Sequence, residues 1–197
     1  MLKYMKILLT AFEPFDGQTS NSSLEVLNRI SDADNIVKAV LPVSYDKSKE
    51  KINELIDTSN PNIVICLGQA GLANSIRLEK LAINYTRAPI ADNDGVIKEC
   101  GSVIKDSKEA IFTNFAIEKI YKNMVELSKK KYNVRISVSA GSYICNTTYY
   151  VALKRMNGNA LFIHLPYYKG QVNDTNIFQM DIDEMVDTVK YIIDMVK

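Results

Sequence analysis

Residues 139–156, SAGSYICNTTYYVALKRM, place Cys145 directly after a turn of small residues and at the start of a helix-like run. At such a position, unpaired backbone N–H groups and the positive end of the helix dipole stabilise a thiolate. The same N–H groups could receive the oxyanion of a tetrahedral intermediate. The position therefore indicates a nucleophilic thiol, with a buried packing cysteine as the alternative interpretation.

His164 is the only histidine of the chain, and it ends an apolar run that Pro166 stops. A single histidine is more often a packed core residue than a catalytic one. A parallel sheet could nevertheless bring it to Cys145 at one edge, and a Cys–His pair is the minimum for nucleophilic acyl transfer. From these residues alone, a cysteine hydrolase and a packed core are equally well supported.

A third catalytic member would be a carboxylate that fixes the imidazole tautomer. Glu79 in SIRLEKLAIN is one candidate, because it interrupts an apolar run, and Glu13 in AFEPFDG is another. Their spacing does not choose between them.

The elements that must position these side chains alternate along the chain. Short apolar runs predict strands at Lys6–Thr10, Ile36–Leu41, Asn62–Leu67, Ile76–Ile83, Arg135–Ser139 and Leu161–Leu165. Apolar residues at three- and four-residue spacing predict helices at Ser22–Ile30, Asp46–Thr58, Ile117–Lys131, Cys145–Met156 and Asp181–Lys197. This order predicts a single α/β domain over residues 1–197, a three-layer α/β/α sandwich with an open, mostly parallel twisted sheet.

In such sheets, sites form outside the carboxyl ends of the strands. Four segments of this chain follow strand ends and are expected to form the site: Thr10–Gly17, Gly68–Gly71, Ser139–Cys145 and His164–Tyr168.

The composition excludes several classes of protein. With 24 basic and 23 acidic residues among 197, the net charge is +1, so no overall field favours nucleic acid or a membrane surface. No segment approaches the roughly 20 apolar residues of a membrane span. Three cysteines disfavour a secreted disulfide scaffold, which predicts a cytoplasmic protein. Cys66 is expected in the core, Cys100 has no placed partner, and no set of residues has metal-ligand spacing.

Several segments, in their order, resemble the pyroglutamyl peptidase I family, the pyrrolidone-carboxylate peptidases. They are KILLTAFEPFDG near the start, CLGQAG at 66–71, RLEKLAIN at 77–84, ADNDG at 91–95, SAGSYICNTTYY at 139–150 and FIHLPY at 162–167. The resemblance covers roughly residues 5 to 197.

The resemblance implies roles that the residues alone leave open. The family's nucleophile falls on Cys145, its base on His164, and the acid that orients the base on Glu79. It also implies an open α/β/α sandwich and a cytosolic, commonly tetrameric enzyme that needs no cofactor. The implied partners are peptides that begin with pyroglutamate, with neither nucleic acid nor a membrane involved.

The family's substrate carries an uncharged five-membered lactam, which needs an apolar slot and one or two amide partners. Phe12 and Phe15 match the family's ring-binding residues, and Gln69 matches a pocket glutamine. Without the resemblance, the two phenylalanines would be interpreted as core residues and Gln69 as a solvated side chain in a loop.

The chain departs from the family pattern at three places. Pro89 stands where the family has a supporting arginine, and Arg87 lies two positions earlier. Leu72-Ala73 replaces Gly-Arg, and 169–171, Lys-Gly-Gln, replaces Pro-Glu-Gln. These changes make the rate and the specificity less predictable than the triad.

Two other functions compete with a peptidase. A catalytically impaired homologue could bind peptides on the same scaffold, with turnover lost through the altered region around Pro89. A nucleoside phosphorylase-like enzyme would need a basic or glycine-rich phosphate cradle, which this sequence does not contain.

Overall fold

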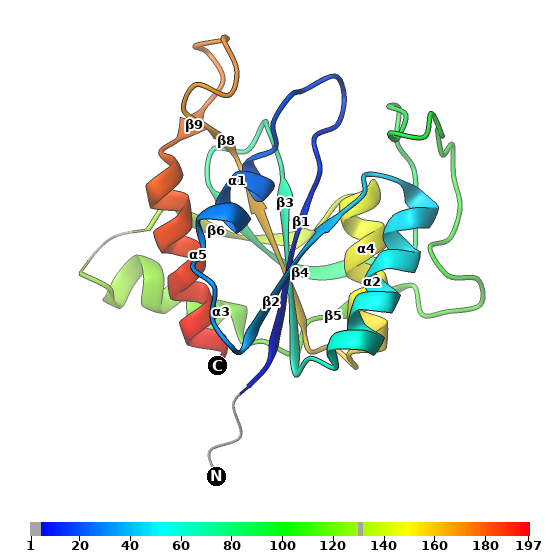
Figure 1. Cartoon of the computed structure of the whole chain (residues 1–197), viewed down its shortest axis with the longest axis horizontal. Coiled ribbons are helices and arrows are strands. Elements are labelled where there is room, and N and C mark those ends of the chain that lie inside the picture. Colours follow the sequence, from blue (N-terminus) through cyan, green and yellow to red (C-terminus); the bar gives the residue numbers. More distant parts are fainter. Residues whose placement is uncertain (1–4, 130–131) are drawn as a thin grey trace.

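The structure is a computed structural model that describes residues 5–129 and 132–197. Strands and helices alternate along the chain (Figure 1). In chain order they are β1 (Ile7–Phe12), α1 (Ser22–Arg29), β2 (Ile36–Leu41), α2 (Tyr45–Ser59), β3 (Ile63–Gln69), β4 (Ile76–Ile83), β5 (Ala110–Phe112), α3 (Ile117–Lys122), the π-helix η1 (Asn123–Leu127), β6 (Val134–Ser139), α4 (Ile144–Arg155), β7 (Ala160–Leu165), β8 (Tyr167–Tyr168), β9 (Gln179–Met180) and α5 (Ile182–Val196).

Seven strands form one mixed sheet in the order β2-β1-β3-β7-β4-β5, with β6 paired to β4. The pairs β1–β2, β1–β3, β3–β7 and β4–β6 are parallel, whereas β4 runs antiparallel to β7 and to β5. The predicted fold class, an open and mostly parallel sheet in an α/β domain, is confirmed. Strands β5, β8 and β9 were not predicted, because runs of two or three residues are too short to show a periodicity.

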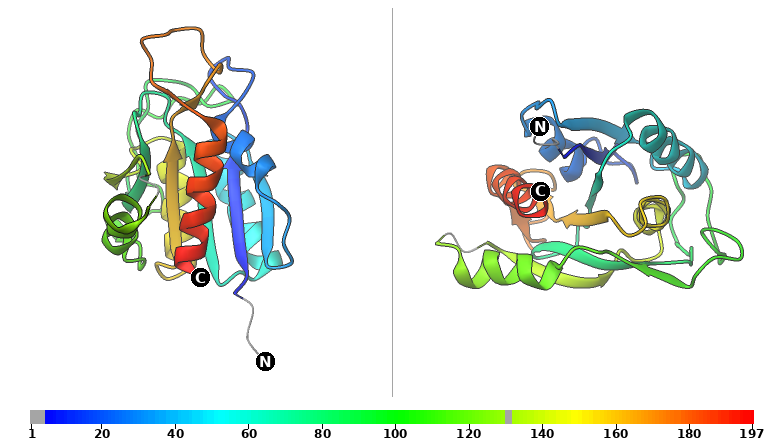
Figure 2. Two further views of the ribbon diagram at one scale, coloured as in Figure 1. Left: turned by 90° about the vertical axis from the view of Figure 1, so that its left-hand side faces the viewer. Right: turned by 90° about the horizontal axis from the view of Figure 1, so that it is seen from below.

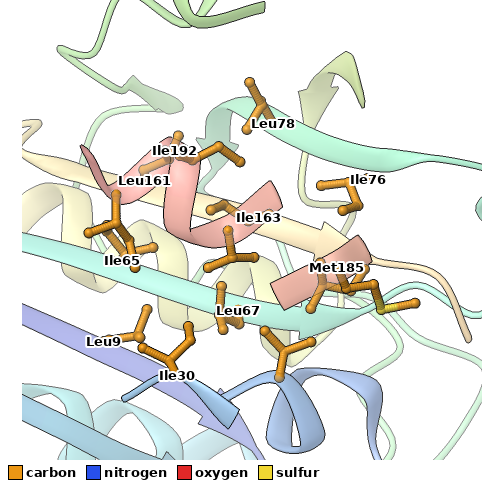
Figure 3. Packing of buried hydrophobic residues seen from close by; sticks show 14 of the residues in the cluster. Leu9, Ile30, Ile65, Leu67, Ile76, Leu78, Leu161, Ile163, Met185 and Ile192 are labelled. Carbon is orange, nitrogen blue, oxygen red and sulfur yellow. The ribbon is translucent and has the colours of Figure 1, made fainter. Parts of the chain in front are cut away.

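Helices cover both faces of the sheet, α1, α3 and α5 on one side and α2 and α4 on the other (Figures 1 and 2). Alternate residues of the central strands belong to different cores. In β3, Ile65 and Leu67 pack under α5, while Val64 and Cys66 pack on the side of α4. Figure 3 shows the first of these cores, in which strand side chains meet α5 residues such as Met185. Burial on both faces explains why these strands read as continuous apolar runs.

The predicted helix Ile117–Lys131 is wrong over its second half. The α-helix ends at Lys122, and a π-helical turn follows, in which the Ser128 N–H donates to the Asn123 carbonyl at 2.7 Å. Ser128 then leaves the helix with an extended backbone. An apolar pattern does not distinguish a widened turn from an α-helix. Lys130 and Lys131, the last two residues of the predicted helix, lie outside the described residues.

Capping side chains fix the starts of the helices. Asn21 accepts a hydrogen bond from the Ser23 N–H at α1, and Ser44 does so from the Lys47 N–H at α2. At α4, by contrast, Tyr143 offers no side-chain cap, so the first turn of that helix keeps its N–H groups for other partners.

Candidate active site

The four segments expected to form a site do converge at one end of the sheet. Side chains that follow β1, β3 and β6 line one cavity, and in the parallel register Gly68 of β3 pairs with His164 of β7. The loop after β1 and the loop between β8 and β9 project from this same end, at the top of Figure 1.

His164 and Glu79 form a buried pair. The imidazole Nδ1 lies 2.7 Å from Glu79 Oε1, and the exposed fractions of the two residues are 7% and 1%. The pair forms across the antiparallel ladder, where Arg77 pairs with His164 and Glu79 with Phe162. The other carboxylate oxygen of Glu79 is buried and has no hydrogen-bond partner in the described part of the chain.

Cys145 and His164 approach each other across an intervening strand. The strands before and after α4 are not neighbours, since β4 lies between β6 and β7. Helix α4 follows β6 and packs against β4, β7 and β3, which places the Cys145 side chain beside Gly68, the register partner of His164. A Cβ on Gly68 would lie 2.6 Å from the Phe162 ring and 3.2 Å from Cys145 Sγ. Glycine at this position therefore leaves the room that the thiol occupies.

Burial lowers the pKa of His164, but hydrogen bonding to Cys145 and its negative charge, followed by those of Glu79, outweigh burial and raise the pKa to about 9. The Phe162 ring, whose centroid is 4.7 Å from that of His164, covers the imidazole on one side. At neutral pH the ring therefore carries a proton.

The turn before Cys145 is built from small residues for a backbone reason. Gly141 has a φ of 81°, a left-handed conformation that glycine adopts without strain. Asn146, directly after Cys145, is fully buried; its side chain accepts from the Ile83 N–H at 2.9 Å and donates to the carbonyls of Ile83 and Tyr85. Three hydrogen bonds thus fix the start of α4 to the end of β4.

The other two thiols lie in different environments. Cys66 is fully buried, as expected, and burial raises its pKa to about 12. Cys100 is exposed. All three cysteines lie in the described part of the chain, and all are free.

A narrow cavity of about 40 Å³ opens beside Cys145. Its small volume suits a compact group rather than a long side chain. The cavity is lined by Phe12, Phe15 and Gln69, the three residues that the resemblance assigns to the substrate pocket. Their roles in substrate binding remain predictions. The remaining lining residues are Asn21, Val43, Tyr143, Ile144 and Cys145.

Sequence reasoning missed Tyr143 and Tyr149. The Tyr143 hydroxyl donates to the Ala91 carbonyl at 2.9 Å, and its ring packs on Phe15, with centroids 6.2 Å apart. The fully buried Tyr149 donates to the Glu79 carbonyl at 3.0 Å. The available signal was their position in the segment SAGSYICNTTYY, two residues before and four residues after the cysteine.

Glu13, the alternative acid, has a different role. Its Oε1 accepts from the Val43 N–H at 3.0 Å and from Asn93 Nδ2 at 2.8 Å. Next to Asn93, the buried Asp92 accepts from the Tyr45 N–H at 3.0 Å, at the start of α2. The ADNDG segment therefore anchors a long loop to the segment after β1 and to α2.

One departure from the family pattern, around Arg87 and Pro89, lies in this loop. Arg87 is exposed; its backbone N–H donates to the Ser142 carbonyl, and its carbonyl accepts from the Ser142 hydroxyl at 2.7 Å. Arg87, Pro89 and Ser142 line an open hollow of about 650 Å³. Leu72 is 88% exposed, whereas Ala73 is buried.

No three His, Cys, Asp or Glu side chains gather as metal ligands within residues 5–129 and 132–197. None of the helices in the described part of the chain has the length and apolarity that a bilayer crossing requires.

Comparison with known proteins identifies the family. The family model described as pyroglutamyl peptidase matches residues 5–197. The pyrrolidone-carboxylate peptidase of Thermosipho africanus is 39% identical over 193 residues, 92% of each chain, and that of Thermosipho melanesiensis is 36% identical over 96% of each chain. A mutant pyrrolidone carboxyl peptidase of Pyrococcus furiosus superimposes with a TM-score of 0.90 at 30% identity, over 98% of each chain. The corresponding enzyme of Fervidobacterium islandicum gives 0.88 at 36% identity, over 96% of each. The chain belongs to the pyroglutamyl peptidase family.

Proposed function

We propose that this protein hydrolyses the peptide bond that follows an N-terminal pyroglutamyl residue, as a cysteine peptidase. The observation that carries the proposal is the buried His164–Glu79 pair, with Cys145 at the start of α4 beside Gly68, the register partner of His164. Membership of the pyroglutamyl peptidase family supports the same substrate.

In the first half of the reaction, Cys145 is the nucleophile. Its proton resides on the ring nitrogen of His164 that does not face Glu79, and the sulfur attacks the carbonyl carbon of pyroglutamate. The oxyanion that forms is received by the N–H groups of the first turn of α4, which has no side-chain cap. His164 then gives its proton to the leaving amine, and a thioester remains on Cys145.

In the second half, a water molecule attacks the thioester, and His164 accepts a proton from it. Pyroglutamate leaves, and the thiolate is restored beside a protonated imidazole. Glu79 binds Nδ1 through both halves, which holds the ring in one tautomer and stabilises its positive charge.

Recognition follows from the chemistry of the cavity. Phe12 and Phe15 offer apolar faces to the lactam ring, and Gln69 offers a hydrogen bond. An N-terminal glutamate or glutamine would bring an ammonium group into this cavity without a partner and should be rejected. Proline keeps the ring but carries a charge and lacks the ring carbonyl.

We further propose a cytoplasmic enzyme that assembles as a homo-oligomer, with a tetramer expected from the family resemblance and no cofactor required. Three free thiols are consistent with a reducing compartment. No observation favours a catalytically impaired peptide-binding protein.

The test is hydrolysis of pyroglutamyl-aminomethylcoumarin, with prolyl, glutaminyl and glutamyl reporters measured alongside. The pyroglutamyl reporter should be cleaved far faster than the other three, and prior treatment with iodoacetamide should abolish the activity. A purified protein that is inert toward pyroglutamyl reporters, or equally active after complete alkylation, would refute the proposal.

A further inference from the structure

We infer that Gln171 and Gln18 determine specificity by holding the Gln69 amide as a hydrogen-bond donor toward the ring carbonyl of the substrate. The inference rests on the proposed function, because it takes Gln69 as the pocket residue that meets the lactam. Gln171 and Gln18 are positioning residues: both bind Gln69, and neither lines the cavity beside Cys145.

The orientation of the Gln69 amide is set by a backbone group. The Ser22 N–H lies 2.9 Å from Gln69 Oε1. A backbone N–H only donates, so the side-chain atom that faces it must be the oxygen. Ser22 is the first residue of α1 and is fully buried, so this contact is part of the rigid fold.

The orientation of Gln171 is set in the same way. The Tyr168 N–H donates to Gln171 Oε1 at 3.2 Å, which turns the Nε2 group toward Gln69. That group lies 2.5 Å from Gln69 Oε1. With Ser22 and Gln171 both donating, the two lone pairs of the Gln69 oxygen are used, and the oxygen accepts nothing further.

Gln18 binds the other end of the Gln69 amide. Gln69 Nε2 donates to Gln18 Oε1 at 3.0 Å, and Gln18 Nε2 donates to the Tyr167 hydroxyl at 2.7 Å. The Tyr167 ring is itself fixed against Gly71, where an added Cβ would lie 2.2 Å from it. The loop after β1 and the loop after β8 are thereby joined through Gln69.

One N–H of Gln69 remains without a protein partner among the described residues, on a side chain that lines the cavity beside Cys145. Gln69 can therefore donate to a ligand but not accept from it. The lactam carbonyl of pyroglutamate is an acceptor and fits this group. Proline offers no acceptor there, and its binding would leave the buried N–H unpaired.

The first test replaces Gln171 by methionine, which has similar length but cannot donate. Gln171→Met removes the donor to Gln69 together with longer contacts to Gln18 and the Ser20 carbonyl. It should raise KM for the pyroglutamyl reporter about three- to tenfold, the range of a neutral hydrogen bond, with kcat little changed. The matched control is Gln179→Met on the paired strand β9, because among the described residues Gln179 binds the Gly170 N–H and the Val172 carbonyl and not Gln69. A KM in Gln171→Met equal to that of Gln179→Met, with both proteins folded, would overturn the inference.

The second test identifies the ligand group. Competitive inhibition is measured with 2-pyrrolidone, which has a ring carbonyl and a ring N–H, and with cyclopentanone, which has the carbonyl alone. Gln171→Met should weaken both inhibitors by the same factor. Weakening of 2-pyrrolidone alone would assign the contact to the ring N–H and contradict a donor at Gln69.

The third test separates positioning from space filling. In Gln171→Glu, an ionised carboxylate can still accept from Tyr168 but cannot donate to Gln69. The ratio of its KM to that of the wild type should be high at pH 7 and fall toward one as the pH is lowered and the carboxyl regains a proton. A ratio that is constant with pH would mean that Gln171 only fills space.

Failure of the inference and failure of the proposed function have different signatures. A wild-type enzyme that cleaves the pyroglutamyl reporter, with Gln171 variants that behave like Gln179→Met, retains the function and rejects the inference. If the wild type is inactive, the function is rejected. The inference can then still be tested by ligand-observed NMR, which compares the binding of 2-pyrrolidone to the wild type and to Gln171→Met. Weaker binding to Gln171→Met supports the inference, and equal binding rejects it.

Discussion

Two clusters at the same end of the sheet each contain a glutamate, and they differ in what the glutamate binds. In the strand-end cluster (Glu79, His164 and Cys145), the acid is held on β4 and contacts an imidazole. In the loop cluster (Glu13, Asp92 and Asn93), the acid accepts from a backbone N–H and an amide.

The difference shows how a carboxylate's partners indicate its role. Glu13 oxygens meet groups that cannot titrate, so the contacts connect loops. Glu79 meets a group that exchanges a proton, and it keeps a second buried oxygen without a partner in the described part of the chain. Such an oxygen is costly in a folded protein, and proteins accept that cost mainly where function requires it.

The largest effect is expected inside the strand-end cluster. Cys145→Ala should lower kcat/KM for the pyroglutamyl reporter by at least about a thousandfold, because it removes the only group that forms the acyl-enzyme. Cys66→Ala is the matched control; its thiol is fully buried, with a pKa raised to about 12, and activity should stay within a few-fold of wild type. Normal turnover by Cys145→Ala would contradict the assignment of Cys145 as the nucleophile.

The next effect compares the two acids directly. Glu79→Gln should lower kcat by roughly a hundredfold or more, since an amide can present an N–H to Nδ1 and favour the wrong tautomer. Glu13→Gln keeps an acceptor for the Val43 N–H and should lower kcat only a few-fold. Steady-state kinetics of the two variants, with melting temperatures to verify folding, measures the contrast. An unchanged kcat in Glu79→Gln together with a strongly lowered kcat in Glu13→Gln would assign the orienting acid to Glu13 instead of Glu79.

The two clusters also show what a single sequence can predict. Strands such as β3 were predictable because burial on both faces gives a continuous apolar run, and α4 because a small-residue turn precedes it. The antiparallel pairing of β4 with β7 was not predictable, since the order of strands in a sheet depends on contacts between segments that are distant in sequence. His164 and Cys145 nevertheless lie at the expected end of the sheet.

The choice between Glu79 and Glu13 shows the same limit. Both acids sit in apolar surroundings in the sequence, and only the ladder that pairs Glu79 with Phe162 brings one of them to the histidine. The family resemblance pointed to Glu79, and spacing could not. Gln171 was noted only as part of a departure from the family pattern, because its contacts with Gln69 and Gln18 join loops that are far apart in sequence.

A smaller effect is expected at the cavity that adjoins the strand-end cluster. Phe15→Ala should weaken pyroglutamyl substrates about tenfold to a hundredfold, because a buried aromatic contact of this size contributes roughly 1.5–3 kcal/mol. Phe12→Ala should do the same and also lower the melting temperature, since Phe12 is only 2% exposed and packs against Phe162. Reporter kinetics checks both variants. Unchanged KM values, or comparable cleavage of prolyl and pyroglutamyl reporters by the wild type, would contradict this pocket.

The smallest effect concerns protonation in the strand-end cluster. The chain has one histidine, so a single pair of imidazole signals reports on His164 in an NMR titration. We expect a pKa of about 9 in the wild type, because Cys145 and Glu79 outweigh the effect of burial. Cys145→Ala should lower this pKa, while Glu13→Gln should leave it unchanged. Equal values in the wild type and in Cys145→Ala would show that the thiol does not act on the ring.

The same shift should appear as a pH dependence of stability. The folded-state pKa of His164 lies above the ordinary value of 6.5, so its contribution to the free energy of unfolding is complete below pH 6.5 and is lost as the pH rises through about 9. Between these limits, the melting temperature of the wild type should therefore fall more than that of His164→Gln, in which no imidazole titrates. Linkage over this interval corresponds to about 3 kcal/mol at most, and each kcal/mol to about 2–4 °C for a protein of this size, so the excess fall should be up to roughly 10 °C. Glu13→Gln should follow the wild-type curve in shape, because Glu13 binds Val43 and Asn93 rather than His164. Parallel melting curves for the wild type and His164→Gln would show that protonation of His164 does not contribute to stability in this range. The two clusters would then differ in geometry alone.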